Sequence, residues 1–137
     1  MDSSATARTP LAEVSGLNVS FVSRDATVHA VNGIDFAVHD GKVLCILGES
    51  GSGKSVSLRA LLRLLPRHAR IEGSIRVAGE EVLSMPARAL RNLRGGKVAM
   101  IFQEPMTALD PVYTVRQQIG EAVRRHTGAG RAAARWR

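Results

Sequence analysis

Eight consecutive residues combine three glycines with a lysine and hydroxyl side chains, which suits them to binding phosphate. They are Gly48, Glu49, Ser50, Gly51, Ser52, Gly53, Lys54 and Ser55, and they match the pattern G-x-x-x-x-G-K-[ST]. Glycine lets the backbone turn sharply, so that successive N–H groups can approach an anion closely. The lysine adds a positive charge, and the last hydroxyl is a suitable ligand for Mg²⁺. The pattern therefore predicts a site for a nucleoside triphosphate.

The segments on either side of this loop support that prediction. Residues 43–47 are wholly apolar, which is typical of a strand buried on both faces of a sheet. Residues 56–65 carry leucines at helical spacing, and the positive dipole end of such a helix would point at the phosphates. The alternative is a flexible Gly/Ser turn with an incidental lysine, which this strand–loop–helix context disfavours.

The rest of the chain predicts an α/β protein in which antiparallel strands precede the loop. Residues 11–22 alternate as a strand, and residues 28–38 predict one or two strands with a turn at Asn32-Gly33. Residues 72–79 predict a short strand, and residues 98–102 a second buried strand. Helices are expected from Pro86 to just before Gly95, from Val115 to about residue 127, and again from Arg131.

Composition limits the class of protein. The 137 residues are 45% hydrophobic, enough for one modest domain, and no segment approaches the ~20 apolar residues of a membrane span. Residues 1–10 are polar and small, so they predict a disordered lead-in without the apolar stretch of a secretory signal. The single cysteine, Cys45, excludes an intramolecular disulfide, fits a reducing cytosolic setting and is expected to be a small buried hydrophobe.

The net charge of +7 is concentrated at the end of the chain, where residues 116–137 hold six arginines and one glutamate. A basic tail suits nucleic acid or an anionic membrane surface. Here the arginines lie among alanines with Trp136 as the only aromatic residue, so a solvated helix face is the preferred interpretation. No nucleic-acid partner is expected.

Four stretches together match a known pattern: residues 30–36, 48–56, 61–66 with 73–75, and 100–112. The last reads Met-Ile-Phe-Gln-Glu-Pro-Met-Thr-Ala-Leu-Asp-Pro-Val and is the most specific. The chain resembles the N-terminal part of the ATP-binding subunit of ABC transporters. The closer resemblance is to subunits that energise uptake of dipeptides, oligopeptides and, in some cases, nickel. The similarity covers about residues 11–135.

The resemblance implies a P-loop NTPase core of the ABC type with an N-terminal antiparallel β-subdomain, ending at the start of the helical subdomain. Residues 11–137 would form this incomplete ATP-binding domain. The implied cofactors are ATP and Mg²⁺. The implied partners are transmembrane permease subunits and a second ATP-binding subunit, at the cytoplasmic face of the cell membrane. The transported solute is not encoded in the ATP site.

The resemblance also assigns roles to single residues. The loop and Val56 would contact the nucleotide, Lys54 and Gln103 would be the catalytic residues, and Ser55 and Gln103 would approach Mg²⁺. The alternative is that Gln103 is an ordinary glutamine in a surface loop, with no role at the ion. Phe21 lies at the position where family members carry an aromatic residue, more usually Tyr, that stacks on adenine. The alternative is that Phe21 is a strand residue whose side chain faces the core. Residues 105–114 would face the permease, with Asp110 at a position where Asn is common.

Several family motifs do not occur in these 137 residues. There is no Leu-Ser-Gly-Gly loop, no apolar run ending in Asp-Glu, and none of the four histidines follows such a run. Glu49 and Glu104 are poor substitutes for the general base, which typically contributes 10²–10⁴-fold to a rate. The isolated chain is expected to be unstable, since its two apolar strands need neighbours beyond residue 137.

Three functions therefore remain open. The first is an N-terminal fragment of a subunit that energises peptide uptake, and the second is a non-catalytic remnant that binds nucleotide at best. The third is an unrelated P-loop protein, such as a small-molecule kinase or a nucleic-acid-dependent ATPase. The third is supported only by the basic tail, and the stretch around Gln103 argues against it.

Overall fold

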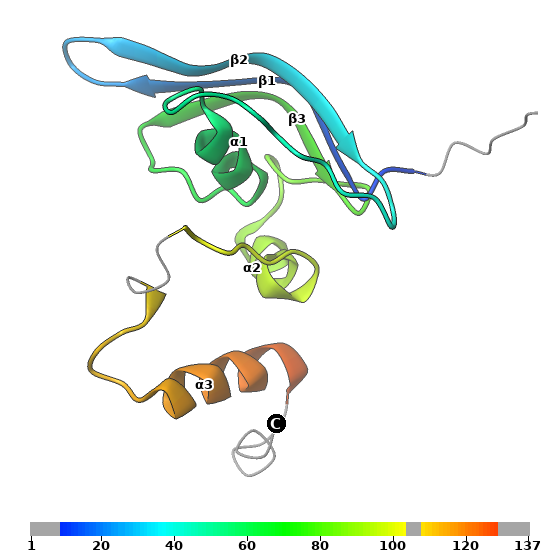
Figure 1. The fold of residues 1–137 in the computed structure, drawn as a ribbon, viewed down its shortest axis with the longest axis vertical. Coiled ribbons are helices and arrows are strands. Elements are labelled where there is room, and N and C mark those ends of the chain that lie inside the picture. The colour runs from blue at the N-terminus through cyan, green and yellow to red at the C-terminus, as the bar shows by residue number, and fades with distance from the viewer. Residues whose placement is uncertain (1–8, 104–107, 129–137) are drawn as a thin grey trace, which may run out of the picture. The chain divides into compact units, whose positions relative to one another are not determined.

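The computed structural model describes residues 9–103 and 108–128, which fall into two compact units (Figure 1). One unit runs to Leu90 and the other begins at Arg91. Most of the lead-in predicted for residues 1–10 lies outside the described residues, as does the helix predicted from Arg131.

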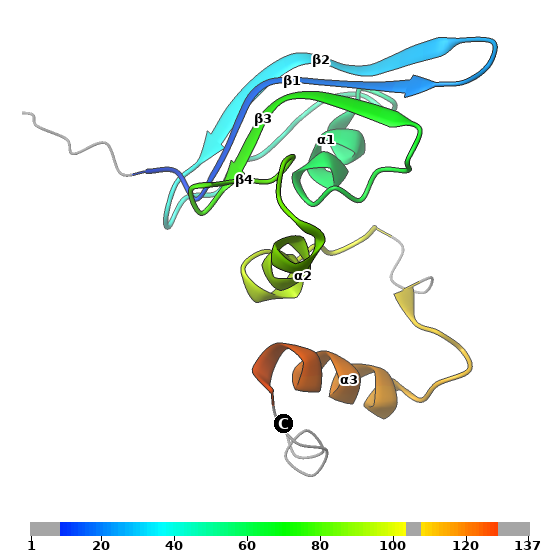
Figure 2. The ribbon, with the colours of Figure 1, turned by 180° about the vertical axis from the view of Figure 1, so that it is seen from behind.

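The first unit is built on an antiparallel sheet with the strand order β2-β1-β3-β4. The strands are β1 (Ala12–Val22), β2 (Thr27–Val38), β3 (Ala69–Val77) and the short β4 (Glu80–Glu81). Figures 1 and 2 show the three long strands side by side, with β1 in the middle. The predicted antiparallel β structure ahead of the loop is confirmed.

Strand β2 is a single strand, although Asn32-Gly33 had suggested a turn within it. Gly33 does take a positive φ of 63°, but the chain continues in the same direction and β1 stays paired on either side of it. The pairing register between β1 and β2 shifts at several points, including the one opposite Asn32 and Gly33. These shifts are β-bulges, in which one strand carries an extra residue opposite its partner.

Three helices are present among the described residues: α1 (Lys54–Leu61), α2 (Ala87–Gly96) and α3 (Val115–Thr127). Helix α1 stops before the predicted end at residue 65, because Arg63 adopts a positive φ of 49° that no α-helix accommodates. The Arg63 guanidinium donates instead to the Met85 carbonyl at 2.7 Å. No described helix is long and apolar enough to cross a membrane.

Helices α2 and α3 end as the sequence predicts. In α2 the helical dihedrals stop at Arg94 and Gly95, where Gly95 has a φ of 79°. Helix α3 begins with a capping box, in which Thr114 accepts from the Gln117 N–H and the Gln117 side chain accepts from the Thr114 N–H. It ends at Gly128 in the left-handed conformation.

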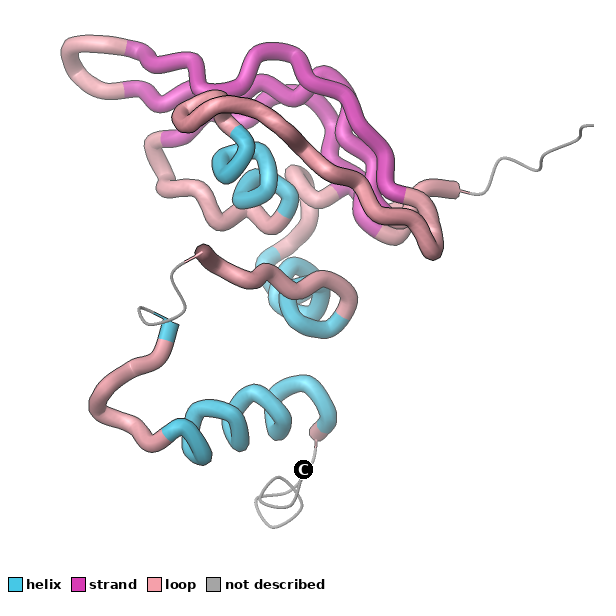
Figure 3. The backbone as a smooth tube through the Cα atoms, viewed as in Figure 1, coloured by secondary structure: helices cyan, strands magenta, loops and turns pink. Residues whose placement is uncertain are grey.

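The two predicted buried strands, residues 43–47 and 98–102, are wrong for this structure. Residues 43–47 are drawn as a loop between β2 and α1 in Figure 3. Val43 is 97% exposed and Ile101 95% exposed, and Cys45 is also exposed instead of buried. A buried strand requires hydrogen-bonded neighbours and covering side chains. Among the described residues, neither segment is paired in a strand, and residues 98–102 make only the isolated bridge Arg94–Val98.

The core of the first unit lies between the sheet and α1, which contacts β1, β2 and β3. Leu17, Val19 and Ile75 are at most 1% exposed, and Ala60 of α1 is fully buried. The other buried apolar side chains of this unit are Val14, Val31, Leu62, Val77, Val82, Met85 and Leu90. Burial at about 25 cal/mol per Å² of apolar surface is the main force that holds α1, and with it the preceding loop, on the sheet.

Glu81 closes the turn between β3 and β4 with its side chain. Its carboxylate accepts from the Ser74 hydroxyl at 2.6 Å, from the Ile75 N–H at 3.1 Å and from the Leu83 N–H at 3.2 Å. Burial raises the pKa of this carboxyl, but the three hydrogen bonds and the charge of Arg76 outweigh burial and hold the pKa below its ordinary value of 4.5.

This arrangement predicts an acid-sensitive contribution to stability. The pKa of Glu81 is depressed on folding, so its contribution to the unfolding free energy is complete above pH 4.5 and is lost as the pH falls through the folded-state value. Glu81→Gln should lower the unfolding free energy by about 1 kcal/mol at pH 7 and flatten its decline in acid. Urea denaturation between pH 7 and pH 3 measures both effects. Glu72→Gln, which removes an exposed carboxylate from β3, is the control. Equal profiles for both variants would contradict the prediction.

Candidate nucleotide-binding site

The predicted phosphate-binding loop leads directly into α1. Gly51 and Gly53 both lie in the left-handed region, with φ of 82° and 86°, and Gly53 is the N-cap of α1. No side chain caps this helix end, and its first turn carries no acidic residue. The first N–H groups of α1 are thus not bound by a cap, and no carboxylate in that turn competes with an anion for them.

Lys54 folds back over the loop that precedes it. Its Nζ donates to the Gly48 carbonyl at 2.7 Å, to the Glu49 carbonyl at 2.5 Å and to the Ser52 hydroxyl at 3.2 Å. A Cβ added at Gly48 would lie 2.6 Å from the Ser52 Oγ, so a side chain there would require the Ser52 hydroxyl to rotate away. The ammonium group is therefore held at the loop itself.

A β-bulge in β2 supports the loop from behind. Val19 pairs with Val31 and the next residue, Ser20, pairs with His29, so that Ala30 is the extra residue of the bulge. A Cβ added at Gly53 would collide with the Ala30 carbonyl oxygen and would lie 3.2 Å from the Val31 side chain. The sequence alone does not reveal the role of Ala30, because its place follows only from the pairing register of two strands.

The first turn of α1 presents the remaining loop residues differently. Ser55 is exposed and Val56 is half-buried, whereas Ser57 is buried and its hydroxyl donates to the Gly53 carbonyl at 3.0 Å. Gly48, Glu49, Ser50, Gly51 and Ser52 are all exposed. The structure thus brings the predicted loop residues and Lys54 together at one helix end, and Ser57, absent from the prediction, ties that end to Gly53.

Phe21 lies near the end of β1 and is half-buried, between the two alternatives that its sequence left open. Its cross-strand neighbours are Val28 and Ala69. Its ring centroid lies 5.8 Å from that of His68, with an interplanar angle of 55°. The predicted stacking on adenine stays a prediction.

Gln103 is exposed and belongs to the second unit, so its predicted approach to Mg²⁺ also stays a prediction. Glu104 and residues 105–107 of the expected permease-facing segment lie outside the described residues. Asp110, in the described part, accepts from the Val112 N–H through Oδ1 at 2.9 Å. Asn carries the same acceptor, which explains why Asp can stand there without cost.

The contact between Gly53 and Ala30 generates a prediction about stability. Gly53→Ala and Gly51→Ala both place a Cβ on a residue with positive φ, which costs about 1–2 kcal/mol. Only at Gly53 does the new Cβ meet the backbone of β2, whereas at Gly51 no described atom lies within 4 Å. Gly53→Ala should therefore lower the unfolding free energy clearly more than Gly51→Ala, measured by urea denaturation without nucleotide. Equal losses would show that the bulge does not constrain the loop.

Comparison with known proteins places this sequence in a family. The sequence pattern of the ABC transporter family matches residues 31–136. The chain is 45% identical, over 93% of its length, to the oligopeptide transport ATP-binding protein OppD of Mycobacterium tuberculosis, of which it covers 21%. It is 44% identical, over 90% of its length, to OppD of Salmonella typhimurium, of which it covers 37%. It is 45% identical, over 93% of its length, to the peptidoglycan transport ATP-binding protein YejF of Agrobacterium fabrum, of which it covers 24%.

A solved structure shares the fold. The ATP-binding cassette MJ0796, in a dimeric post-hydrolysis state bound to ADP and Pi, matches with a TM-score of 0.73 at 20% identity. The match covers 90% of this chain and 53% of that one, and it confirms the predicted fold class. The chain spans less than two fifths of the length of the three relatives described above. With the family pattern matched over residues 31–136, this chain belongs to the ABC transporter family.

Proposed function

We propose that this chain is the nucleotide-binding part of an ATP-binding subunit that energises uptake of peptides across a membrane. The observation that carries the proposal is the loop of residues 48–55, with its uncapped helix end and the Lys54 ammonium held at its carbonyls. The peptide class comes from the relatives, among them two oligopeptide transport ATP-binding proteins at 44–45% identity.

The loop provides what a triphosphate requires. The first N–H groups of α1 and the helix dipole would bind the phosphate oxygens, and the left-handed Gly51 and Gly53 allow the backbone to curve around them. Lys54 would turn from the Gly48 and Glu49 carbonyls to the β- and γ-phosphates. An ammonium–phosphate hydrogen bond is charge-assisted and stronger than the bonds to neutral carbonyls that it replaces.

Mg²⁺ fits the same loop. Ser55 offers an exposed hydroxyl on the first turn of α1, and Mg²⁺ usually takes few protein ligands, completing its octahedron with phosphate oxygens and water. When bound, the ion would neutralise charge on the phosphates. The Gln103 amide is the second candidate near the ion, on the strength of the family resemblance alone.

Hydrolysis and transport would need more than the residues described. We infer that the carboxylate general base comes from a segment that these 137 residues do not contain, and that a second ATP-binding subunit and permease subunits complete the transporter at the cytoplasmic face of the membrane. Exposed apolar side chains at Leu109, Val112 and Tyr113 support a permease contact in the second unit. The competing function is a remnant that binds nucleotide without turnover.

Removal of the Lys54 charge tests nucleotide binding. Lys54→Ala should weaken binding of MgATP by about 10- to 100-fold, the range of a hydrogen bond to a charged group. Isothermal titration calorimetry gives the affinity, on protein whose folding is first verified by a cooperative urea transition. Lys42→Ala removes an exposed lysine twelve residues earlier and should bind MgATP like the unmodified chain. Unchanged affinity in Lys54→Ala would refute binding through the loop.

Uptake in cells tests the transport role. Lys54→Ala, introduced into the gene of the source organism, should abolish uptake of a labelled tripeptide, whereas Lys42→Ala should leave it intact. Normal uptake with Lys54→Ala would contradict a role in peptide import. Nucleotide binding in vitro combined with unaltered uptake in a strain that lacks the gene would favour the non-catalytic remnant.

A further inference from the structure

We propose that Ser57 is a positioning residue for phosphate binding: its hydroxyl fixes the Gly53–Lys54 peptide so that the Lys54 N–H points out of the end of α1. Ser57 lies outside the motif of residues 48–55 and would not touch the nucleotide itself. This role rests on the proposed function, because the loop must first bind the phosphates.

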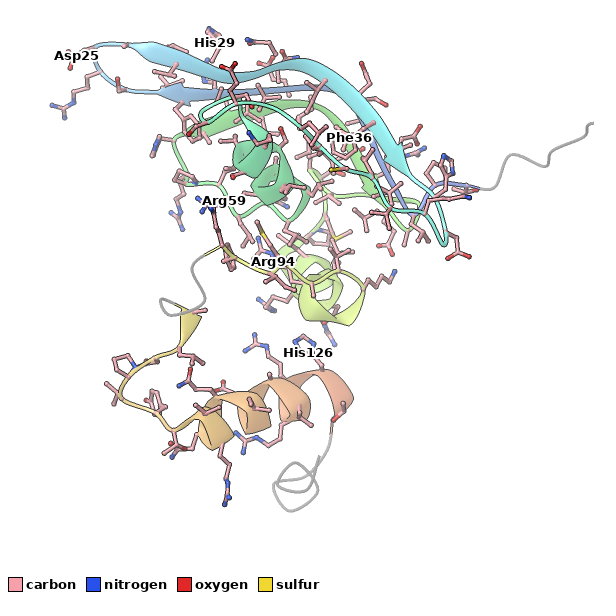
Figure 4. All side chains as sticks on the ribbon, viewed as in Figure 1. Asp25, His29, Phe36, Arg59, Arg94 and His126 are labelled. Atoms are coloured by element: carbon pink, nitrogen blue, oxygen red, sulfur yellow. The ribbon has the colours of Figure 1, made fainter. Side chains whose placement is uncertain are left out.

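Ser57 is a polar side chain in a buried position. Among residues 9–103 and 108–128 it is the only polar side chain that is buried, at 3% exposed. It shares the buried side of α1 with Ala60, whereas Figure 4 shows Arg59 of the same helix extending away from the sheet. A helix position that faces the core ordinarily carries an apolar side chain, and alanine has a higher helix propensity than serine. Packing and helix formation therefore give no reason for a hydroxyl here.

The hydroxyl adds a second hydrogen bond to an oxygen that already has one. The Ser57 N–H donates to the Gly53 carbonyl at 2.8 Å, which is the ordinary bond of an α-helix. The Ser57 hydroxyl donates to the same oxygen at 3.0 Å. Helix α1 has eight residues and no side-chain cap, and so short a helix is marginal by itself. The second bond thus restrains the N-cap residue at which this helix begins.

A restraint on this carbonyl also orients an N–H group. The Gly53 carbonyl and the Lys54 N–H belong to one trans peptide, so they point in opposite directions. Because the carbonyl is directed at Ser57, the Lys54 N–H points out of the N-terminus, where helix N–H groups have no intrahelical partner. A phosphate held by the loop would accept from this N–H. Fixing the peptide before the anion arrives lowers the entropic cost of binding.

Substitution of Ser57 separates positioning from folding, because Ser57→Ala removes the hydroxyl and keeps the backbone bond to Gly53. Calorimetry with MgATP and with Mg-tripolyphosphate is carried out on protein whose cooperative urea transition has been verified. Ser57→Ala should weaken both ligands by the same factor, about two- to tenfold, since the change acts on the phosphates and not on the base. Ser57→Thr keeps a hydroxyl that can bond the carbonyl four residues earlier and should bind both ligands more tightly than Ser57→Ala.

Ser74→Ala is the matched control, because it also removes one serine hydroxyl from the same unit. That hydroxyl donates to Glu81 at 2.6 Å, away from the loop. Ser74→Ala should lower the unfolding free energy without changing either affinity, whereas Ser57→Ala should lower both affinities with little change in the unfolding free energy.

Three results would overturn the role of Ser57 while leaving phosphate binding by the loop intact. They are an unchanged affinity in Ser57→Ala, a loss for MgATP alone, and an equal loss of affinity in Ser74→Ala. Disappearance of the cooperative urea transition in Ser57→Ala would assign the hydroxyl to folding and would also overturn it. If the folded, unmodified chain binds neither ligand, the proposed function itself fails, and this inference fails with it.

Discussion

The close approach of Gly53 to the Ala30 carbonyl is the constraint on which the site depends. A bulge in β2 moves Ala30 out of the regular ladder, and its carbonyl then occupies the space that any side chain at Gly53 would need. Gly53 is also the N-cap of α1, so the same residue joins sheet, loop and helix. Glycine is thus required at position 53 for two reasons: the backbone there is left-handed, and a side chain would collide with the strand behind it.

The hydrogen bonds of Lys54 explain how a strongly charged side chain can be held at this loop. Three oxygen atoms of the loop accept from its Nζ, so the ammonium is solvated by the protein at the place where phosphate is expected. For the proposed triphosphate site this is preorganisation, since a long side chain that is already localised loses less conformational entropy on binding. The N-terminus of α1, which no side chain caps, would also favour an anion, because the positive end of the helix dipole lies there.

Several exposed apolar side chains lie where a neighbouring strand or helix could pack on this fold. Residues 43–47 lead into the phosphate-binding loop, yet Val43 and Leu47 are 97% and 87% exposed. In the second unit Ile101, just before Gln103, is similarly exposed. Such side chains are not stabilised by water, and a sheet neighbour or a covering helix would bury them. The sheet of β1, β2 and β3 is different, because its core is closed by α1 and by Val82, Met85 and Leu90 of the same unit.

The sequence by itself determined the glycine-rich loop ahead of a helix, the strands β1 and β3, the ends of α2 and α3, and the family. All of these depend on residues adjacent along the chain: the glycines and lysine of the loop, the capping box at Thr114, and the glycine after α3. Only the tertiary structure decided three other features. These are the bulge at Ala30 behind Gly53, the pairing of Phe21 with His68, and the exposed, unpaired state of residues 43–47. Each of the three is a relation between segments distant in the sequence. Strand register, and the presence or absence of a neighbouring strand, are set by the packing of the whole unit, which local periodicity does not specify.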